Sequence, residues 1–206
     1  MALGSTIYLL QVRLADSDRG VYEDLEIRAA CHPSEAHEFL ITRVLAYCLE
    51  YQEGIAFAKG GVSDRTEPTL FARDLTGALT LWVEIGVPGA ERLHQASKGA
   101  PRTVVYCHKE ARLLAPLREA AIHRASEIEV LVLERSFVDA LLKHLDRRMR
   151  FDLTVAERHL YCSVGDDSFD TVLQVYPLRY TVMGGKEIIE SHRLAFVLLC
   201  AALTRP

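Results

Sequence analysis

The sequence lacks the short motifs that most often identify an enzyme. It contains no G-x-G-x-x-G, G-x-x-x-x-G-K-[ST], G-x-S-x-G or H-E-x-x-H pattern, so the usual signatures of dinucleotide binding, P-loop nucleotide hydrolysis, α/β-hydrolases and zinc proteases are missing. It also lacks a long apolar run. The longest, LAFVLLCAAL at 194–203, has ten residues, against about 18 for a membrane span, so we expect no membrane partner.

Cysteine is scarce and irregularly placed. The five cysteines are odd in number, widely scattered and without a C-x-x-C pair, which predicts reduced thiols in the core. The N-terminus has no basic segment followed by an apolar run, so no secretory signal is predicted and the cytoplasm is the expected compartment. The eight histidines show no metal-binding spacing, and His159 with Cys162 is too isolated to form half a zinc site.

Positive charge is not in excess either. Lys and Arg total 24 against 28 Asp and Glu, a formal net charge of −4. This balance excludes the strongly basic surface of indiscriminate nucleic-acid binders, although it leaves room for a locally basic groove. What the sequence does have is a hydrophobic content of 50% over 206 residues, enough for one globular domain with a packed core.

Apolar periodicity predicts strands at both ends of the chain and a β-α-β unit between them. Alternation indicates an N-terminal hairpin of strands at 6–14 and 21–29. A long helix follows, with Ser34 as its N-cap, Glu35 in its first turn and its end near Tyr51. The next elements expected are a short apolar run at 55–58, a strand at 79–86, a helix at 91–100 and a strand at 102–108. This strand-helix-strand order favours a parallel pair.

The second half of the chain continues this mixed pattern. We expect a helix from near Pro116 to about Arg124, a strand at 127–134 and a helix introduced by a capping box of Ser136 and Asp139. A terminal meander of strands is predicted at 150–155, 160–164 and 169–176. The predicted fold class is therefore α/β, an α+β fold with a mixed sheet, in one domain over 1–176 with an extension of unassigned role at 177–206.

Several carboxylates stand in places where they invite a functional interpretation. Glu35 and Glu38 lie early in the predicted helix, Asp74 precedes a strand, and Glu84 interrupts the apolar run LWVEI. A carboxylate buried in such a run must be ion-paired, hydrogen-bonded or bound to a cation. The alternation of a strand offers the simpler interpretation that Glu84 lies on the solvent side of the pleat.

Three stretches together resemble a known family. The segments ADSDR at 15–19, HPSE at 32–35 and LWVEIG at 81–86, with Asp74, Gly77 and the closing region after 146–147, resemble the YaeQ family of bacterial proteins, whose fold is a variant of the PD-(D/E)XK nuclease core. The resemblance covers about residues 1–176. It implies a core in which a helix is followed by a three-strand meander, a second helix and a further strand.

The resemblance also implies a metal site. In active nucleases of that superfamily, an Asp and a Glu on adjacent strands hold a divalent ion and a helix Glu assists. Carried over, Asp74 and Glu84 would bind Mg²⁺ or Mn²⁺, which prefer hard oxygen ligands, and Glu35 or Glu38 would be the helix carboxylate. The structural alternatives are helix-dipole complementation for Glu35 and turn formation before Gly77 for Asp74.

One position departs from the pattern of active nucleases. The Lys that orients water in those enzymes, two residues after the strand Glu, is Gly86 in this chain. Because glycine offers no side chain to orient water, activity would need a basic or amide group from elsewhere. The candidates on the helix that follows the strand are Arg92, Gln95 and Lys98, for which a solvated helix face is the alternative.

Three functional hypotheses follow. The leading one is a metal-dependent nuclease or phosphodiesterase acting on DNA or RNA, with Asp74 and Glu84 binding the metal and Glu38 or Gln95 placing the water. The second is a catalytically inactive nucleic-acid or protein interaction module with the same fold, favoured by the missing Lys and the net acidity. In the third the carboxylates are structural, which would follow if Asp74 and Glu84 pointed away from each other.

Overall fold

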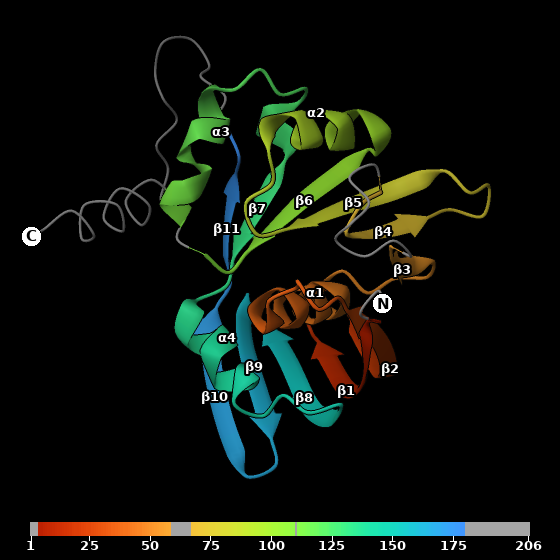
Figure 1. Ribbon diagram of the computed structural model, residues 1–206, viewed down its shortest axis with the longest axis vertical. Coiled ribbons are helices and arrows are strands. Elements are labelled where there is room, and N and C mark those ends of the chain that lie inside the picture. The colour runs from red at the N-terminus through yellow and green to blue at the C-terminus, as the bar shows by residue number, and fades with distance from the viewer. Residues whose placement is uncertain (1–3, 59–66, 110, 180–206) are drawn as a thin grey trace, which may run out of the picture.

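A computed structural model describes residues 4–58, 67–109 and 111–179 and contains two β-sheets with a helix between them (Figure 1). The first sheet has the strand order β10-β9-β8-β1-β2 and the second β11-β7-β6-β5-β4-β3. The strands of the first sheet are β1 (Thr6–Asp16), β2 (Val21–Cys31), β8 (Arg148–Ala156), β9 (His159–Val164) and β10 (Asp167–Val172). Those of the second are β3 (Ile55–Phe57), β4 (Leu70–Arg73), β5 (Leu79–Ile85), β6 (Arg102–Cys107), β7 (Glu129–Val132) and β11 (Gln174–Pro177).

The first sheet joins the two ends of the described chain. Strands β1 and β2 form the predicted N-terminal hairpin, and β1 pairs in parallel with β8, which begins the antiparallel meander β8-β9-β10. Buried and exposed residues alternate along β1, β2 and β8, as expected for a sheet with one face against the core and the other in water. The hairpin and the meander are therefore confirmed.

The second sheet contains the predicted β-α-β unit. Strands β3, β4 and β5 form an antiparallel meander, after which β5, β6 and β7 run parallel to one another. Helix α2 (Ala90–Gly99) connects β5 to β6, and α3 (Ala115–Glu119), flanked by short 3₁₀ turns, connects β6 to β7. The order from helix α1 (His37–Leu49) through the meander and α2 to β6 is the order that the resemblance implies.

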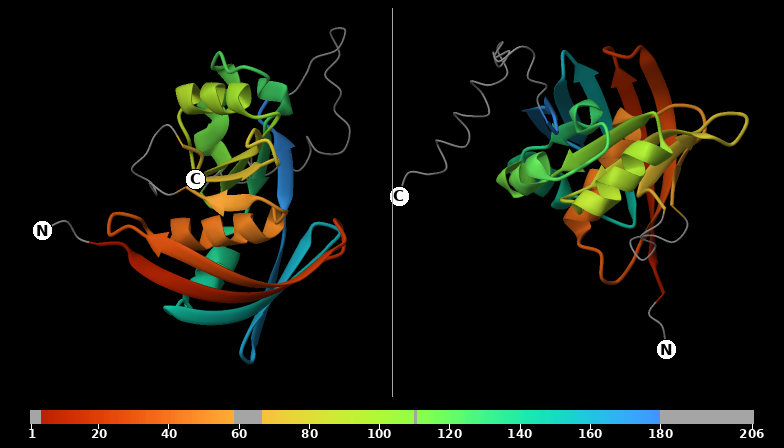
Figure 2. Two further views of the ribbon diagram at one scale, coloured as in Figure 1. Left: turned by 90° about the vertical axis from the view of Figure 1, so that its right-hand side faces the viewer. Right: turned by 90° about the horizontal axis from the view of Figure 1, so that it is seen from above.

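Helix α1 forms the centre of the core, because it lies between the two sheets (Figure 2). Every residue from Leu40 to Leu49 except Tyr47 is buried, and most of them are apolar, as expected of a helix packed on both sides. Helix α4 (Arg135–Leu142) packs beside α1 and against β10. Helices α2 and α3 cover the opposite face of the second sheet. Described helices thus cover both faces of the second sheet but only one face of the first.

Several predicted boundaries are wrong. Helix α1 begins at His37 with Ala36 as N-cap, so Glu35 precedes the helix; the Ser34 hydroxyl instead lies 2.7 Å from the His32 ring. Helix α4 begins at Arg135 without a side-chain cap. The strand predicted at 169–176 is two strands in different sheets, β10 and β11. The residue that caps a helix and the sheet that a strand joins depend on tertiary contacts. Hydrophobic periodicity carries no information about these contacts.

The ADSDR stretch positions α1. Asp16 is buried and accepts a 2.6 Å hydrogen bond from Nε of Arg19. The Arg19 guanidinium in turn donates to the carbonyls of Cys48 and Tyr51, at the C-terminus of α1. Such a cation satisfies the last carbonyls of a helix and complements its dipole. The stretch that carries part of the family resemblance therefore has a structural role.

The cysteines fit the sequence prediction where the structure describes them. Four cysteines are buried and free, at positions 31, 48, 107 and 162. Within the described ranges, every helix is too short or too polar to cross a membrane. The fifth cysteine, the apolar run at 194–203 and the predicted extension from residue 180 onward lie outside the described residues.

Candidate functional site: a buried ion pair on the second sheet

Glu84 is buried near the carboxyl end of β5, with only 3% of its surface exposed. The prediction that it faces solvent is wrong. Alternation of exposed and buried residues holds for a strand whose sheet has one face in water. Strand β5 is an interior strand of a sheet covered on both faces, and its last five residues are all buried. The carboxylate therefore needs partners inside the protein.

Three donors supply these partners. Nε of Arg92 lies 2.8 Å from Oε2 of Glu84, and the Thr69 hydroxyl donates to the same oxygen at 3.2 Å. The Trp82 indole N–H donates to Oε1 at 2.5 Å. Burial raises the pKa of Glu84, and the hydrogen bond and charge of Arg92 oppose that rise. Glu84 is thus held as a hydrogen-bonded ion pair.

Arg92 reaches this site from the first turn of α2. Besides Glu84, it contacts the segment that leads into β4, because its Nη2 donates to the Glu67 carbonyl at 2.8 Å. Of the three residues predicted to replace the missing Lys, Arg92 is the one that contacts Glu84. Gln95 and Lys98 lie on the exposed surface of α2.

Asp74 lies elsewhere, in the turn between β4 and β5. Its carboxylate accepts hydrogen bonds from the Thr76 hydroxyl at 2.6 Å and from the amides of Thr76 and Ala78 at 2.8 and 3.0 Å. These bonds, the Thr76 hydroxyl foremost, lower the pKa of Asp74. Asp74 is exposed and shapes a turn, which is the structural alternative offered by the sequence.

The structure does not bring Asp74 and Glu84 together. The hairpin register pairs Arg73 with Leu79 at the turn and Leu70 with Val83 at the far end. At about 3.3 Å per residue, Glu84 lies roughly 17 Å along the strand from the turn that contains Asp74. In the described part of the chain there is also no cluster of three or more His, Cys, Asp or Glu residues that could hold a metal ion.

Thr69 lies where a second carboxylate would have to stand in order to share a metal ion with Glu84. It directly precedes β4 and reaches the Glu84 carboxylate across the meander. Sequence reasoning missed it because a hydroxyl is not an obvious metal ligand. The available signal was the dipeptide Pro68-Thr69, which resembles the Pro-Asp of the motif name with Thr in place of Asp; the strand that follows it, β4, was not predicted.

The two helix carboxylates form separate ion pairs. Glu35 and Arg43 are both buried, with 3.0 Å between Oε1 and Nη2. Burial raises the pKa of Glu35, and the Arg43 charge opposes that rise. Glu38 is the acidic residue in the first turn of α1, the place predicted for Glu35, and lies 3.7 Å from Arg135. Neither carboxylate has a hydrogen bond or ion pair with Glu84 among the described residues.

Gly86 is required by the backbone. Its φ is +82°, and its amide donates to the Tyr106 carbonyl at 2.8 Å as the chain leaves β5. A lysine in this left-handed region would cost about 1–2 kcal/mol. The backbone conformation at this position therefore disfavours a lysine.

His108 is a further buried polar residue that the sequence did not single out. It follows β6 beside Gly86, where a Cβ added to the glycine would lie 3.9 Å from Cε1 of the imidazole. The residue is 5% exposed, and its Nδ1 has no hydrogen-bond partner among the residues that the structure describes. Burial, followed by the charge of Lys109, lowers the pKa of His108; Arg135 lowers it further and Glu38 raises it.

We expect His108 to make the protein less stable in acid. The ordinary pKa of His is 6.5, so below this pH the unfolded chain binds a proton that the folded protein binds less readily, and the free energy of unfolding falls. Above pH 6.5 the effect vanishes. Thermal melts of wild type and His108→Gln at pH 7.5 and 5.5 test this. The variant should lose less stability between the two values, and parallel losses would contradict the argument. Glu35 and Glu84 act in the opposite direction but are present in both proteins.

Fold and site together define a class: an α+β protein of two mixed sheets around a central helix, with a buried carboxylate-guanidinium pair where β5 leads into α2. The chain belongs to the YaeQ family, because the family model described as "YaeQ protein" matches residues 1–173.

Bacterial relatives agree with this assignment in sequence and in structure. The protein called "Uncharacterized protein YaeQ" from Salmonella typhi is 26% identical over 178 residues, which cover 85% of this chain and 98% of the relative. Its namesake from Escherichia coli (strain K12) is 25% identical with the same coverage. The crystal structure of YaeQ protein from Pseudomonas syringae superposes with a TM-score of 0.74 at 28% identity, covering 84% of this chain and 94% of that one. The YaeQ structure from Xanthomonas axonopodis pv. citri gives 0.71 at 26% identity, with 83% and 97% covered.

Proposed function

We propose that this chain is a catalytically inactive interaction module with a PD-(D/E)XK nuclease-like core. The order of α1, the meander β3-β4-β5, α2 and β6 supports a relationship to that core. The observation that carries the proposal is the ion pair between Glu84 and Arg92. A guanidinium lies against the carboxylate that a divalent cation would need.

The residues present do not fit a divalent metal site. Mg²⁺ and Mn²⁺ are held by several hard oxygen ligands, commonly carboxylates. Here one carboxylate is bonded to Arg92, Trp82 and Thr69, and the second predicted ligand, Asp74, shapes a turn at the other end of the hairpin. Thr69, which does face Glu84, contributes a neutral hydroxyl and no negative charge.

The competing hypothesis is the Mg²⁺- or Mn²⁺-dependent nuclease implied by the resemblance. It requires Glu84 to exchange Arg92 for the metal. It also requires a cationic side chain from another position to stabilise the developing phosphate charge, because residue 86 is a glycine. The exchange would remove the 2.8 Å contact between Arg92 and Glu84 and leave the Arg92 guanidinium without this carboxylate. The arrangement of donors around Glu84 therefore favours the inactive module.

A cleavage assay tests the proposal. Single- and double-stranded DNA and RNA would be incubated with wild type and with Glu84→Gln, each in Mg²⁺ and in Mn²⁺. We expect both proteins to show the same background, because the Glu84 carboxylate has no catalytic role. Circular dichroism and melting temperature would establish that both are folded. Metal-dependent cleavage by the wild type that Glu84→Gln loses would overturn the proposal in favour of the nuclease.

A further inference from the structure

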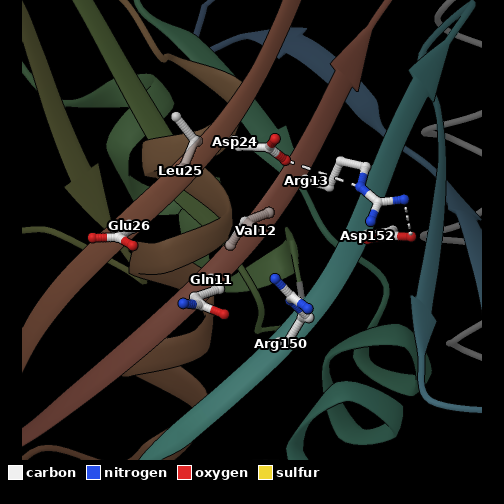
Figure 3. Close-up of a pocket in the computed structure, with 8 residues that line it drawn as sticks. All are labelled: Gln11, Val12, Arg13, Asp24, Leu25, Glu26, Arg150 and Asp152. Atoms are coloured by element: carbon white, nitrogen blue, oxygen red, sulfur yellow. Dashed lines mark ion pairs between the residues drawn. The ribbon is translucent and has the colours of Figure 1, made fainter.

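No element of the described ranges covers the outer face of the first sheet. Helices α1 and α4 cover the inner face, and Figure 3 looks onto the outer one, with helices behind the strands. The outward positions of β1, β2 and β8 are mostly exposed. Sheets of this size normally carry mixed polar residues on a wet face, so the pattern of charge decides whether the face has a further role.

Three arginines gather at one end of this face. Leu9 of β1 pairs with Arg28 of β2 on one side and with Arg148 of β8 on the other. Gln11, two residues along β1, pairs with Arg150. Strands lie about 4.8 Å apart and residues two apart on a strand about 6.6 Å, so the three guanidinium groups start from neighbouring positions. We call these five residues the arginine patch.

The arginines of the patch differ from the fourth arginine of the same face. Arg13 lies 3.5 Å from Asp152 and 3.9 Å from Asp24, so two carboxylates offset its charge (Figure 3). Within the described chain, Arg28, Arg148 and Arg150 are exposed and have no ion pair with a carboxylate. Arg28 and Arg148 lie on either side of Leu9, and Arg148 and Arg150 are two residues apart on β8, so like charges are close together although no two are directly opposite. The protein has more acidic than basic residues, with a net charge of −4, so carboxylates that could pair with these arginines are not scarce. The stability of the fold therefore does not explain why the arginines are unpaired.

The patch adjoins a hollow in the sheet surface. The hollow has a volume of about 310 Å³, and Gln11 and Arg150 of the patch lie on its wall, opposite Glu26 of β2. Leu9 is 43% exposed between Arg28 and Arg148. The surface thus combines hydrogen-bond donors with some apolar area, which suits a ligand that has both phosphate charge and flat apolar groups.

We propose that the arginine patch binds the phosphates of a single-stranded nucleic acid. The inference rests on the proposed function and names the partner of that module. A strand face presents no protruding helix to enter the groove of a duplex, which favours a single strand. Toward the other end of the same face, Tyr22 is 65% exposed opposite Ala15 and Tyr161 is 48% exposed opposite Thr154; a nucleic-acid strand that continued along the sheet from the patch could stack its bases on these rings.

Binding of fluorescein-labelled single-stranded RNA and DNA, followed by fluorescence anisotropy at several salt concentrations, tests the proposal. The variant Arg148→Glu/Arg150→Glu removes two phosphate contacts. We expect a loss of affinity of about tenfold or more, and a slope of log Kd against log salt that is smaller by about 1.4, at roughly 0.7 per contact for a single strand. The affinity of the milder Arg148→Gln/Arg150→Gln variant should lie between the affinities of this variant and of wild type.

The matched control is Lys98→Glu/Lys143→Glu, which makes the same change in net charge on exposed parts of α2 and of the end of α4. It should retain most of the affinity and the full salt dependence. No binding by wild type at low salt, or an equal loss in this control, would overturn the proposal. So would poly-glutamate that competes as well as the oligonucleotide, since the patch would then recognise any polyanion. Cleavage of the labelled strand would instead contradict the inactive module, so the two failures are distinguishable.

Discussion

Replacing Arg43 with Met is expected to lower the free energy of unfolding by about 3–5 kcal/mol, the usual cost of breaking a buried ion pair from one side. The side chains of both Glu35 and Arg43 are almost completely buried. The substitution would leave the Glu35 carboxylate without its cation and the Ala30 carbonyl without the 2.6 Å hydrogen bond that Arg43 donates. Urea denaturation followed by circular dichroism measures the loss.

The pH dependence of that loss has a definite sign. Burial already raises the pKa of Glu35, and removal of Arg43 would raise it further. A carboxyl group with a raised pKa in the folded state favours folding at low pH, and this contribution disappears as the pH rises through the folded pKa. The penalty of Arg43→Met should therefore be smaller at pH 5 than at pH 8.

A second variant separates the ion pair from simple packing. In Glu35→Gln/Arg43→Met no buried charge is left alone, so part of the stability should return relative to Arg43→Met. A cost below about 1 kcal/mol for Arg43→Met, or no recovery in the double variant, would mean that the pair contributes little and that the neighbouring apolar contacts dominate.

Conversion of the Glu84 site into a metal site is expected with two substitutions, Thr69→Asp/Arg92→Gln. The new carboxylate would stand beside Glu84, since the Thr69 hydroxyl is already 3.2 Å from Oε2. Two carboxylates without a cation repel each other, and Mn²⁺ relieves the repulsion. At a free Mn²⁺ concentration about 100 times Kd the stabilisation is about 2.7 kcal/mol, equivalent to roughly 5–10 °C for a domain of this size.

Thermal unfolding with and without Mn²⁺ measures this gain, and isothermal titration calorimetry gives its stoichiometry. The control Thr69→Asn/Arg92→Gln has the same loss of Arg92 but no second carboxylate, so its melting temperature should hardly respond. Wild type should not respond either. An equal Mn²⁺ response in wild type would show that Arg92 does not block the cation, contrary to the proposed function.

Much of the fold could be predicted because its signals are local. The alternation along β1 and β2, the turn between them and the strand-helix-strand order of β5, α2 and β6 all follow from periodicity over a few residues. The division between β10 and β11 could not be predicted in this way. Residues 169–176 have the composition of a single strand, and it is pairing with β7 that places the second part in the other sheet.

Two residues of the candidate site, Glu84 and Arg92, could be predicted from local sequence, whereas Thr69 could not. Glu84 stood out as a charge in an apolar run, and Arg92 as a cation one turn into the next helix. Asp74 was chosen by residue type, but the register of the β4-β5 hairpin decides which residue faces Glu84, and that residue is Thr69. Register depends on strand pairing and turn geometry, so a search for acidic residues alone passes over a threonine.

The crossing of the chain from β10 to β11 also affects when the protein can fold. A single residue, Leu173, separates a strand of the first sheet from a strand of the second, and β1 must await β8, more than a hundred residues later, for its parallel partner. Contacts of such long sequence separation slow folding. During synthesis, the hairpin β1-β2 and the edge of β7 stay unpaired on one side until nearly all of the described chain has left the ribosome. Unpaired edges of this kind are the usual starting points for aggregation, so the nascent chain is most exposed to misassembly just before its last strands emerge.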